Sequence, residues 1–269
     1  MADPWQLGEA YERFMGRWSR PVAREFLHWV VGVKNGRWLD IGCGTGALSE
    51  IIVNMMAPTS VIGVDFSAGF IRHAQQLHPE AVYDFRLGSA LALPVASGSC
   101  DVVVSAIALN FFPEPDTAVA QMHRVAKPGG TVALYVWDYA ADMQMLRYFW
   151  DAAATLDPDA ATLDEGDRFP ICQPEPLAEL FVEAGFDGVE VKALETTAVF
   201  TNFDDYWQPF LGQNGPAPGY VATRTPVQQE ALAHHLRHHL PIQTDGTIPL
   251  KMRAWAVRGT KSSIVNRKS

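Results

Sequence analysis

The sequence predicts an α/β protein whose mostly parallel sheet is covered by helices on both faces. Three observations lead to this fold class. Between residues 37 and 137, short apolar runs alternate with amphipathic stretches, which is the pattern of βαβ units. A glycine-rich segment, WLDIGCGTG at residues 38–46, contains the end of the first apolar run. The next run, SVIGVD at residues 60–65, ends on an acid, in the place where nucleotide-binding folds bond ribose hydroxyls.

The chain begins with a predicted helical segment, residues 1–36. Tyr11, Phe14, Met15 and Trp18 lie at i, i+3, i+4 and i+7 and would line one helix face. A second helix is expected to restart at SRP, because Pro21 is tolerated in a first helical turn. The aromatic stripe is interpreted either as ordinary packing or as a lid over the ligand edge of the sheet.

The central segment alternates strands with helices. Strands are predicted at residues 37–41, 60–65, 82–88, 100–109 and 131–137, and helices at 45–57, 67–77 and 116–126, with a turn at 127–130. Strands joined through helices imply right-handed crossovers and a parallel sheet.

After residue 138 this alternation loosens. The pattern predicts a mostly helical stretch at 139–170, a helix at 174–186, a strand at 189–194, a helix at 225–240 and a last strand at 247–257. The interval between the last two strands is interpreted as a cap and not as a separate domain. The expected division is a lid at 1–36, a core at 37–200 and 245–260, a cap insertion at 201–244 and a flexible tail at 261–269.

Composition and charge exclude several function classes. The formal net charge is −9 and no Lys/Arg cluster offsets it, apart from the tail, which argues against a nucleic-acid partner. The three cysteines are far apart and form no CxxC pair, so neither a disulfide framework nor a zinc ribbon is indicated. No apolar run is long enough for a membrane span, and a cytoplasmic protein is expected.

The sequence of the glycine segment distinguishes between two candidate ligand classes, dinucleotides and S-adenosylmethionine. The dinucleotide fingerprint GxGxxG is broken, because position 47 is Ala and the third glycine, Gly46, comes one residue early. Asp40 lies directly before the loop, where a carboxylate would repel a pyrophosphate. The same carboxylate would suit a ligand that carries an ammonium and a sulfonium group.

The class I S-adenosylmethionine-dependent methyltransferases are the family that this chain resembles. The likeness is carried, in order and spacing, by WLDIGCGTG, VIGVDFS, FRLGSALALP, DVVVSAIALNFFPEP and RVAKPGGTVALYVWD. It is greatest to the branch that includes ubiquinone- and menaquinone-biosynthesis enzymes. The resemblance implies a Rossmann-like, seven-stranded, mostly parallel sheet with a helical cap, in which the last strand, at 247–257, runs antiparallel.

The resemblance also implies roles for single residues in binding S-adenosylmethionine, whose product is S-adenosylhomocysteine. Asp65 would bind the ribose hydroxyls. The methionine end would lie against Asp40, Gly42, Gly44 and Gly46.

The remaining implied contacts involve the adenine and the methyl group. Phe66 would pack on the adenine, Ser89 and Ala90 would read its edge, and Ala106 would lie beside the methyl donor. The family usually has Asp at the position of Ser89, so a serine hydroxyl would accept the adenine amine with less charge assistance.

Residues beyond the cofactor site are candidates for the substrate or the lid. They are Tyr11, Met15, Trp18, Asn110, Trp137, Trp150, Tyr206 and Trp207. Asp138 is the candidate catalytic acid or base, because it ends a strand at the ligand edge and precedes an aromatic stretch. The alternative interpretation makes it the N-cap of a helix that starts near Ala140.

Four histidines, in the sequence HHLRHH, form two i, i+4 pairs on the helix at 225–240. Nothing nearby in the sequence supplies further ligands or an organised second shell, so no metal site is expected. The favoured function is methyl transfer to a small, apolar or aromatic metabolite. A dinucleotide-dependent oxidoreductase and a non-catalytic cofactor-binding protein remain alternatives, and the acceptor atom and oligomeric state stay open.

Overall fold

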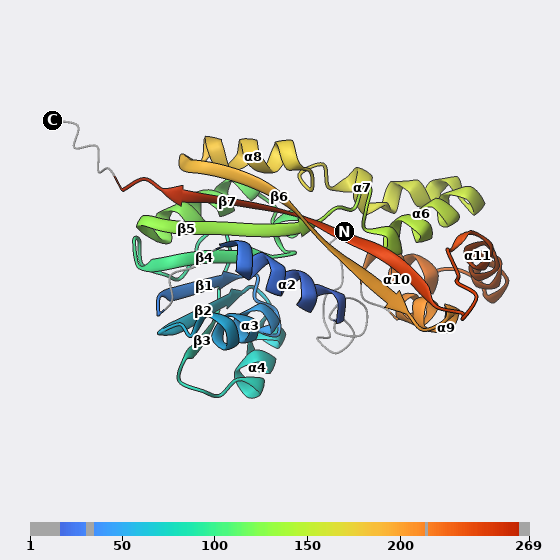
Figure 1. Cartoon of the computed structure of the whole chain (residues 1–269), viewed down its shortest axis with the longest axis horizontal. Helices are drawn as coiled ribbons and strands as arrows, with labels where there is room; N and C mark the ends of the chain where they lie inside the picture. The colour runs from blue at the N-terminus through green and yellow to red at the C-terminus, as the bar shows by residue number, and fades with distance from the viewer. Residues whose placement is uncertain (1–16, 31–34, 213–214, 264–269) are drawn as a thin grey trace. The chain divides into compact units, whose positions relative to one another are not determined.

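The computed structural model describes residues 17–30, 35–212 and 215–263 of the 269-residue chain. Within these residues the strands form one sheet in the order β3-β2-β1-β4-β5-β7-β6 (Figure 1). The strands are β1 (Arg37–Ile41), β2 (Ser60–Asp65), β3 (Tyr83–Leu87), β4 (Cys100–Ala106), β5 (Ala126–Trp137), β6 (Phe186–Phe200) and β7 (Ile248–Lys261). The predicted seven-stranded sheet is therefore confirmed.

Helices follow or precede nearly every strand. The α-helices are α2 (Arg17–Val30), α3 (Ala47–Met56), α4 (Ala68–Leu77), α5 (Pro115–Val125), α6 (Gln144–Leu156), α7 (Glu165–Arg168), α8 (Pro174–Glu183), α9 (Phe203–Trp207), α10 (Pro216–Ala222) and α11 (Pro226–His239). Short 3₁₀ helices are η2 (Leu109–Phe111), η3 (Pro158–Leu163) and η4 (Gln208–Leu211).

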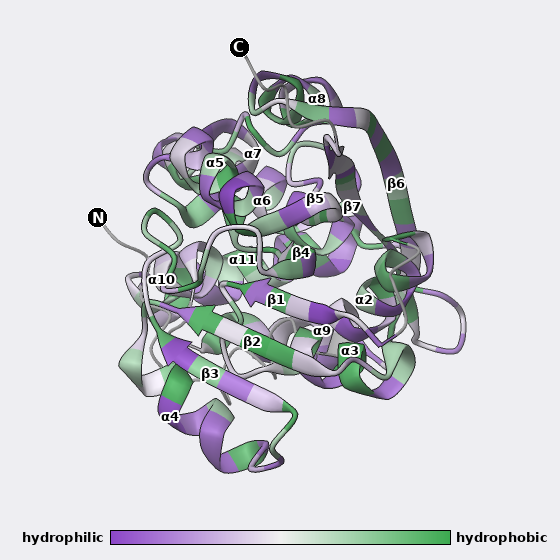
Figure 2. Ribbon diagram, turned by 90° about the vertical axis from the view of Figure 1, so that its left-hand side faces the viewer, coloured by the Kyte–Doolittle hydropathy of each residue, from purple (hydrophilic) through white to green (hydrophobic). Residues whose placement is uncertain are grey.

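The first five strands are parallel, as predicted. β1 pairs in parallel with β2 and β4, β2 with β3, and β4 with β5. The arrows of β6 and β7 point in opposite directions in Figure 1. β1, β2 and β4 are almost fully buried, which explains their continuous apolar sequences, and Figure 2 shows β2 as a mostly hydrophobic strand.

Two compact units make up the chain. One unit comprises residues 20–136, 173–194 and 255–269 and holds the β1–β5 sheet with the adjoining parts of β6 and β7. The other comprises residues 1–19, 137–172 and 195–254 and is mostly helical. We call them the sheet unit and the helical unit. The helical unit takes in residues 137–172, whereas the expected cap insertion covered only 201–244.

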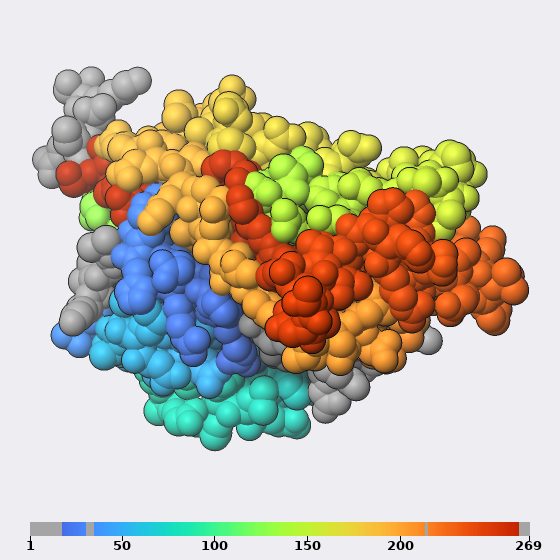
Figure 3. All heavy atoms as spheres, turned by 45° about the vertical axis from the view of Figure 1, so that its right-hand side comes forward, coloured from blue at the N-terminus to red at the C-terminus, as the bar shows by residue number. Residues whose placement is uncertain are grey.

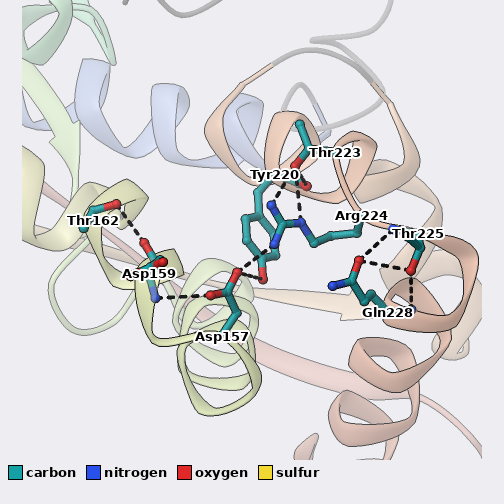
Figure 4. A network of polar contacts seen from close by, with 8 residues as sticks. All are labelled: Asp157, Asp159, Thr162, Tyr220, Thr223, Arg224, Thr225 and Gln228. Atoms are coloured by element: carbon teal, nitrogen blue, oxygen red, sulfur yellow. Dashed lines mark hydrogen bonds and ion pairs between the residues drawn. The ribbon is translucent and has the colours of Figure 1, made fainter.

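The helical unit has an aromatic core of its own. The Phe149 and Phe210 rings stack with centroids 4.5 Å apart, and Trp150 and Tyr220 pack around Phe149. At its polar edge, the Asp157 carboxylate accepts hydrogen bonds from the Tyr220 hydroxyl and from Arg224, at 3.2 and 2.7 Å (Figure 4). These contacts join the end of α6 to the connection between α10 and α11.

Three predicted boundaries are wrong for identifiable reasons. β4 ends at Ala106 and not at residue 109, because Ile107 takes a left-handed backbone conformation (φ 55°) and η2 follows. Residues 127–130 belong to β5, where a register shift against β4 accommodates them. The helix expected to restart at Ser19 begins at Arg17, so Pro21 lies inside it and not in its first turn.

Candidate cofactor and substrate site

The carboxyl ends of β1, β2 and β4 meet at one edge of the sheet unit. Ile41 lies opposite Val64 of β2 and Ser105 of β4 in the parallel register. The Ser105 hydroxyl donates a 2.7 Å hydrogen bond to the Ile41 carbonyl, which ties the ends of β1 and β4 together. The residues that follow these strands are therefore neighbours, as expected for a ligand edge.

The loop after β1 has three glycines with positive φ, and they have different neighbours. A Cβ on Gly42 would lie 2.5 Å from the Ala108 Cβ, and one on Gly46 would lie 3.0 Å from the Phe85 ring. A Cβ on Gly44 would meet nothing within 4 Å. Gly42 and Gly46 are thus required by the protein's own packing, whereas Gly44 borders open space that a ligand could fill.

Asp40 is a buried acid with an unused oxygen. It is 1% exposed, and its Oδ2 accepts a 2.7 Å hydrogen bond from the Ser49 hydroxyl. Its Oδ1 has no hydrogen-bond partner within the described residues. Burial raises the pKa of Asp40 to about 7; the Ser49 bond opposes this and the Asp65 charge adds to it. A cationic ligand group would stabilise the charged form of this carboxylate.

Asp65 holds the glycine loop in place. Its Oδ2 accepts from the Gly44 amide at 3.0 Å, and its Oδ1 accepts from the Ser67 amide at 2.8 Å. Burial raises the pKa of Asp65, and these backbone hydrogen bonds oppose that rise. Each carboxylate oxygen can accept one further hydrogen bond, which leaves capacity for the predicted ribose hydroxyls.

Phe66 is the most exposed large apolar side chain at this edge, at 80%. It follows Asp65, whose register partner on β3 is Leu87, and Leu87 is also exposed. An exposed aromatic ring keeps apolar surface in contact with water, which is unfavourable, and it makes few packing contacts. The predicted contact with adenine would cover it.

Ser89, Ala90 and Ala106 remain as predicted contacts without a direct test. The Ser89 hydroxyl accepts a 3.1 Å hydrogen bond from the Leu91 amide, so part of its acceptor capacity serves the local turn. Ala90 is half-buried beside it. Ala106 is the last residue of β4 and is also half-buried.

Asn110 is the second buried polar group without a partner at this end of the sheet unit. It lies in η2, four residues after the end of β4, and is 7% exposed. Within the described residues neither its Nδ2 nor its Oδ1 makes a hydrogen bond. Native proteins rarely leave a buried amide unpaired, so Asn110 offers a donor and an acceptor to a ligand.

In the helical unit, Asp138 is buried and its carboxylate already has protein partners. Its Oδ2 accepts from the Asp142 amide at 3.1 Å and lies 3.4 Å from the Arg253 guanidinium. The expected helix near Ala140 is absent, and α6 begins at Gln144, so Asp138 stabilises a turn instead of a helix. These contacts favour the structural interpretation, and the catalytic one stays a prediction.

The aromatic candidates of the helical unit are packed in its interior. Trp150, Tyr206, Trp207 and Trp137 are all buried. The Tyr206 hydroxyl donates a 2.9 Å hydrogen bond to the Met145 carbonyl, so its polar group is satisfied inside the unit. Trp18 packs against Phe200 with ring centroids 4.8 Å apart. Tyr11 and Met15 lie outside the described residues.

Two residues with functional chemistry escaped the sequence analysis. Ser49 is the hydrogen-bond donor to Asp40, and its place in the first turns of α3 is the only signal that could have indicated it. Glu165 is a buried acid of the helical unit that accepts a hydrogen bond from the Trp150 indole. Burial raises the pKa of Glu165 to about 7. Its sequence context, DEGDR, gives no hint of burial.

Comparison with known proteins identifies the family of this chain. Residues 39–134 match the model of a methyltransferase domain family. The chain belongs to the class I S-adenosylmethionine-dependent methyltransferases, in the branch that includes the enzymes of ubiquinone and menaquinone biosynthesis.

Three curated relatives support this assignment. A demethylmenaquinone methyltransferase of Geobacillus kaustophilus is 32% identical over 193 residues, 65% of this chain and 80% of that protein. One of Renibacterium salmoninarum is 37% identical over 118 residues, 44% of this chain and 46% of that protein. The 2-methyl-6-phytyl-1,4-hydroquinone methyltransferase of a Synechocystis strain is 32% identical, over 66% of this chain and 55% of that protein. The chain thus spans about half the length of two of these relatives.

A solved structure shows the same fold. The phosphoethanolamine N-methyltransferase 2 of Haemonchus contortus, in complex with S-adenosyl-L-methionine, superposes with a TM-score of 0.60. The alignment covers 94% of this chain and 56% of that one, at 18% identity. Within the described residues no helix is both long and apolar enough to cross a bilayer.

Proposed function

We propose that this methyltransferase transfers the methyl group of S-adenosylmethionine to a small aromatic metabolite of the hydroquinone type. The observation that carries the cofactor assignment is the open space at Gly44, whose amide donates to the buried Asp65 and whose loop follows the buried Asp40. The unused Oδ1 of Asp40 fits a cationic group there, and the exposed Phe66 ring fits a flat base. A pyrophosphate would meet two buried carboxylates, and within the described residues no basic side chain lies within 4 Å of a Cβ on Gly44.

The cofactor would supply a methyl group on a positively charged sulfur, which is a good leaving group. The protein's own residues would then mainly bind and orient. Gly44 would allow the backbone close to the ligand, Asp40 would balance its positive charge, and Asp65 would accept from the ribose hydroxyls. Alignment of the acceptor and exclusion of water would supply most of the rate enhancement.

Asn110 is the residue that we propose contacts the methyl acceptor. It follows β4, whose last residue, Ala106, is the predicted neighbour of the methyl group. Its free amide can donate to a ring oxygen and accept from a ring hydroxyl. A hydroquinone or a related phenol carries both kinds of group, and two of the relatives act, by their names, on demethylmenaquinone and on a hydroquinone.

Phe66→Ala tests the cofactor site with little risk to folding, because the ring is 80% exposed. Stacking of a base on an aromatic ring is worth about 1–3 kcal/mol, so S-adenosylhomocysteine should bind about 5- to 150-fold more weakly by calorimetry. Val227→Ala, at an equally exposed apolar residue on α11, is the matched control and should bind normally. Equal affinity in the wild type and Phe66→Ala would remove Phe66 from the site.

The same calorimeter separates the dinucleotide alternative. NADH should give no heat of binding at concentrations that saturate the protein with S-adenosylhomocysteine. Binding of NADH and not of S-adenosylhomocysteine would contradict the proposed function. With the cofactor confirmed, methyl transfer is measured over a panel of hydroquinones, phenols and amines, which identifies the acceptor atom.

A further inference from the structure

Helix α11 of the helical unit displays four histidines on a well-anchored scaffold. Its start is fixed by a capping box, in which Thr225 and Gln228 exchange hydrogen bonds. The buried residues of the helix are Leu232, Ala233 and Leu236. His234, His238 and His239 are exposed and His235 is half-buried. In the space-filling view of Figure 3, the orange-red atoms of this part of the chain lie at the surface on the right.

The four side chains form two close pairs. The rings of His234 and His238 have centroids 4.3 Å apart, and those of His235 and His239 have centroids 4.1 Å apart. Each pair is separated by four residues, so both members lie one above the other on the helix surface. The ring planes are inclined by 40° in the first pair and by 13° in the second, so His234 and His235 would turn to direct a nitrogen at an ion held by the second histidine of the pair.

The second histidine of each pair has its tautomer fixed by the backbone. His238 Nδ1 lies 2.9 Å from the His234 carbonyl oxygen, and His239 Nδ1 lies 2.8 Å from the His235 carbonyl oxygen. A carbonyl oxygen only accepts, so Nδ1 carries the proton and Nε2 keeps its lone pair. Within the described residues Nε2 of these two rings makes no hydrogen bond.

The two carbonyl contacts supply part of an organised second shell. Metal-binding histidines almost always donate their second ring N–H to a carbonyl or carboxylate, which orients the ring and makes the free nitrogen more basic.

Nearby charge does not oppose a cation strongly. Arg237 lies between the pairs in the sequence, but its guanidinium stacks over the Phe203 ring at 4.2 Å. It also lies 3.4 Å from the Glu230 carboxylate, which offsets its charge. The Arg237 guanidinium, the positive charge closest in sequence to the histidines, therefore contacts Phe203 and Glu230.

We propose that α11 carries two bidentate sites for a divalent transition-metal ion, His234 with His238 and His235 with His239. Imidazole pairs favour Cu²⁺, Ni²⁺ and Zn²⁺, with Cu²⁺ bound most tightly, whereas Mg²⁺ and Ca²⁺ require oxygen ligands. No group of three or more metal-ligating side chains exists within the described residues. Water therefore completes the coordination of each ion, and the sites exchange metal readily.

Titration of the untagged full chain with CuCl₂, NiCl₂ and ZnCl₂ by calorimetry tests the proposal. Two double variants remove two histidines each but differ in what they leave. His235→Gln/His239→Gln keeps the pair His234–His238 and should bind one ion with unchanged affinity. His238→Gln/His239→Gln leaves two adjacent histidines that project in different directions, and should bind at least about tenfold more weakly because the second ligand no longer acts intramolecularly.

Equal binding by the two double variants would overturn the proposal, because it would show single imidazoles acting independently. Absence of binding by the wild type would overturn it as well. Gln is a good helix former, and far-UV circular dichroism checks that both variants keep α11. Variant His73→Gln, on α4, controls for the loss of a histidine elsewhere, and MgCl₂ should give no heat.

Discussion

At the scale of single residues, the unpaired Asn110 amide shows how function and stability oppose each other. Burying an amide without a hydrogen bond costs about 1–3 kcal/mol by mutational measures. Asn110 is 7% exposed and its amide has no partner within the described residues. Such a cost is expected at a residue selected for contact with a ligand rather than for stability.

Asn110→Leu should therefore stabilise the protein and reduce its activity. Leu has a similar volume and no polar atoms, so the free energy of unfolding should rise by about 1–3 kcal/mol. Methyl transfer should fall because the acceptor loses its contact. Urea denaturation and turnover with an identified acceptor measure the two effects.

Asn202→Leu provides the opposite control. The Asn202 side chain caps α9 by accepting a 2.9 Å hydrogen bond from the Asp205 amide. Its loss should lower the free energy of unfolding by about 0.5–2 kcal/mol. If Asn110→Leu destabilised the protein to the same extent, Asn110 would be a structural residue.

Glu165 makes stability depend on pH. Burial raises its pKa from the ordinary value of 4.5 to about 7, so the folded state holds a proton that the unfolded state releases. The stability that this group contributes is complete below about pH 4.5 and is lost as pH rises through about 7. Asp40, with its pKa also raised to about 7, acts in the same direction.

Glu165→Gln should remove much of this dependence. A glutamine stays neutral and can still accept from the Trp150 indole. From pH 5 to pH 8 the unfolding free energy of the wild type should fall, and that of the variant should fall by about 2–3 kcal/mol less. Urea denaturation at four pH values measures this difference, and parallel curves for the two proteins would show that Glu165 does not titrate there.

At the scale of elements, the loop after β1 contains one glycine that packing requires, Gly42, and one that faces open space, Gly44. Gly42→Ala would place a Cβ 2.5 Å from the Ala108 Cβ, whereas Gly44→Ala would meet nothing within 4 Å. Both have positive φ, so both substitutions carry the left-handed penalty of about 1–2 kcal/mol. Only Gly42→Ala adds overpacking.

Gly44→Ala should accordingly fold with a modest loss of stability and bind S-adenosylhomocysteine at least about tenfold more weakly. Gly42→Ala should lose about 1–3 kcal/mol more unfolding free energy. Thermal unfolding and calorimetry of the pair distinguish the effects. Normal affinity in Gly44→Ala would show that no ligand approaches this part of the backbone.

The elements show which features can be read from sequence. Strong periodicity located β1, β2 and α4, and Ser67 caps α4 as its position suggested. The end of β4 could not be predicted, because the left-handed turn at Ile107 lies inside an apolar run with no glycine to mark it. The cofactor candidates could be named because their motif is local.

The partners of those candidates depend on the tertiary structure and left no local signal. Asp138 illustrates this: its ion pair reaches Arg253, far along the chain, so sequence spacing could not reveal that the carboxylate is already paired. Glu165 likewise has no periodic apolar context that would indicate burial.

At the scale of the whole molecule, the two compact units share their strands. β6 and β7 each have residues in both units, and the chain passes from one unit to the other several times. Neither unit is a continuous segment that could be excised with its strands intact. We expect a single cooperative unfolding transition despite the length of the chain.

Coincident urea curves from tryptophan fluorescence and far-UV circular dichroism would confirm this expectation. Saturating S-adenosylhomocysteine should move both curves together, by about 2.7 kcal/mol at a hundredfold excess over its dissociation constant. A fluorescence transition that separates from the circular dichroism transition would mean that the units unfold independently.

β6 has a consequence for how the protein behaves among its own copies. It is the last strand of the sheet, fifteen residues long, and an unprotected edge of this length is a template for intermolecular pairing and aggregation. The exposed charged residues along this strand are Asp187, Glu190, Lys192 and Glu195. Glu190 and Glu195 are held by Arg258 and Arg253 of β7, so a second chain that approached this edge would meet fixed charges and lose their solvation. We expect these charged residues to oppose edge-to-edge pairing when the protein is concentrated.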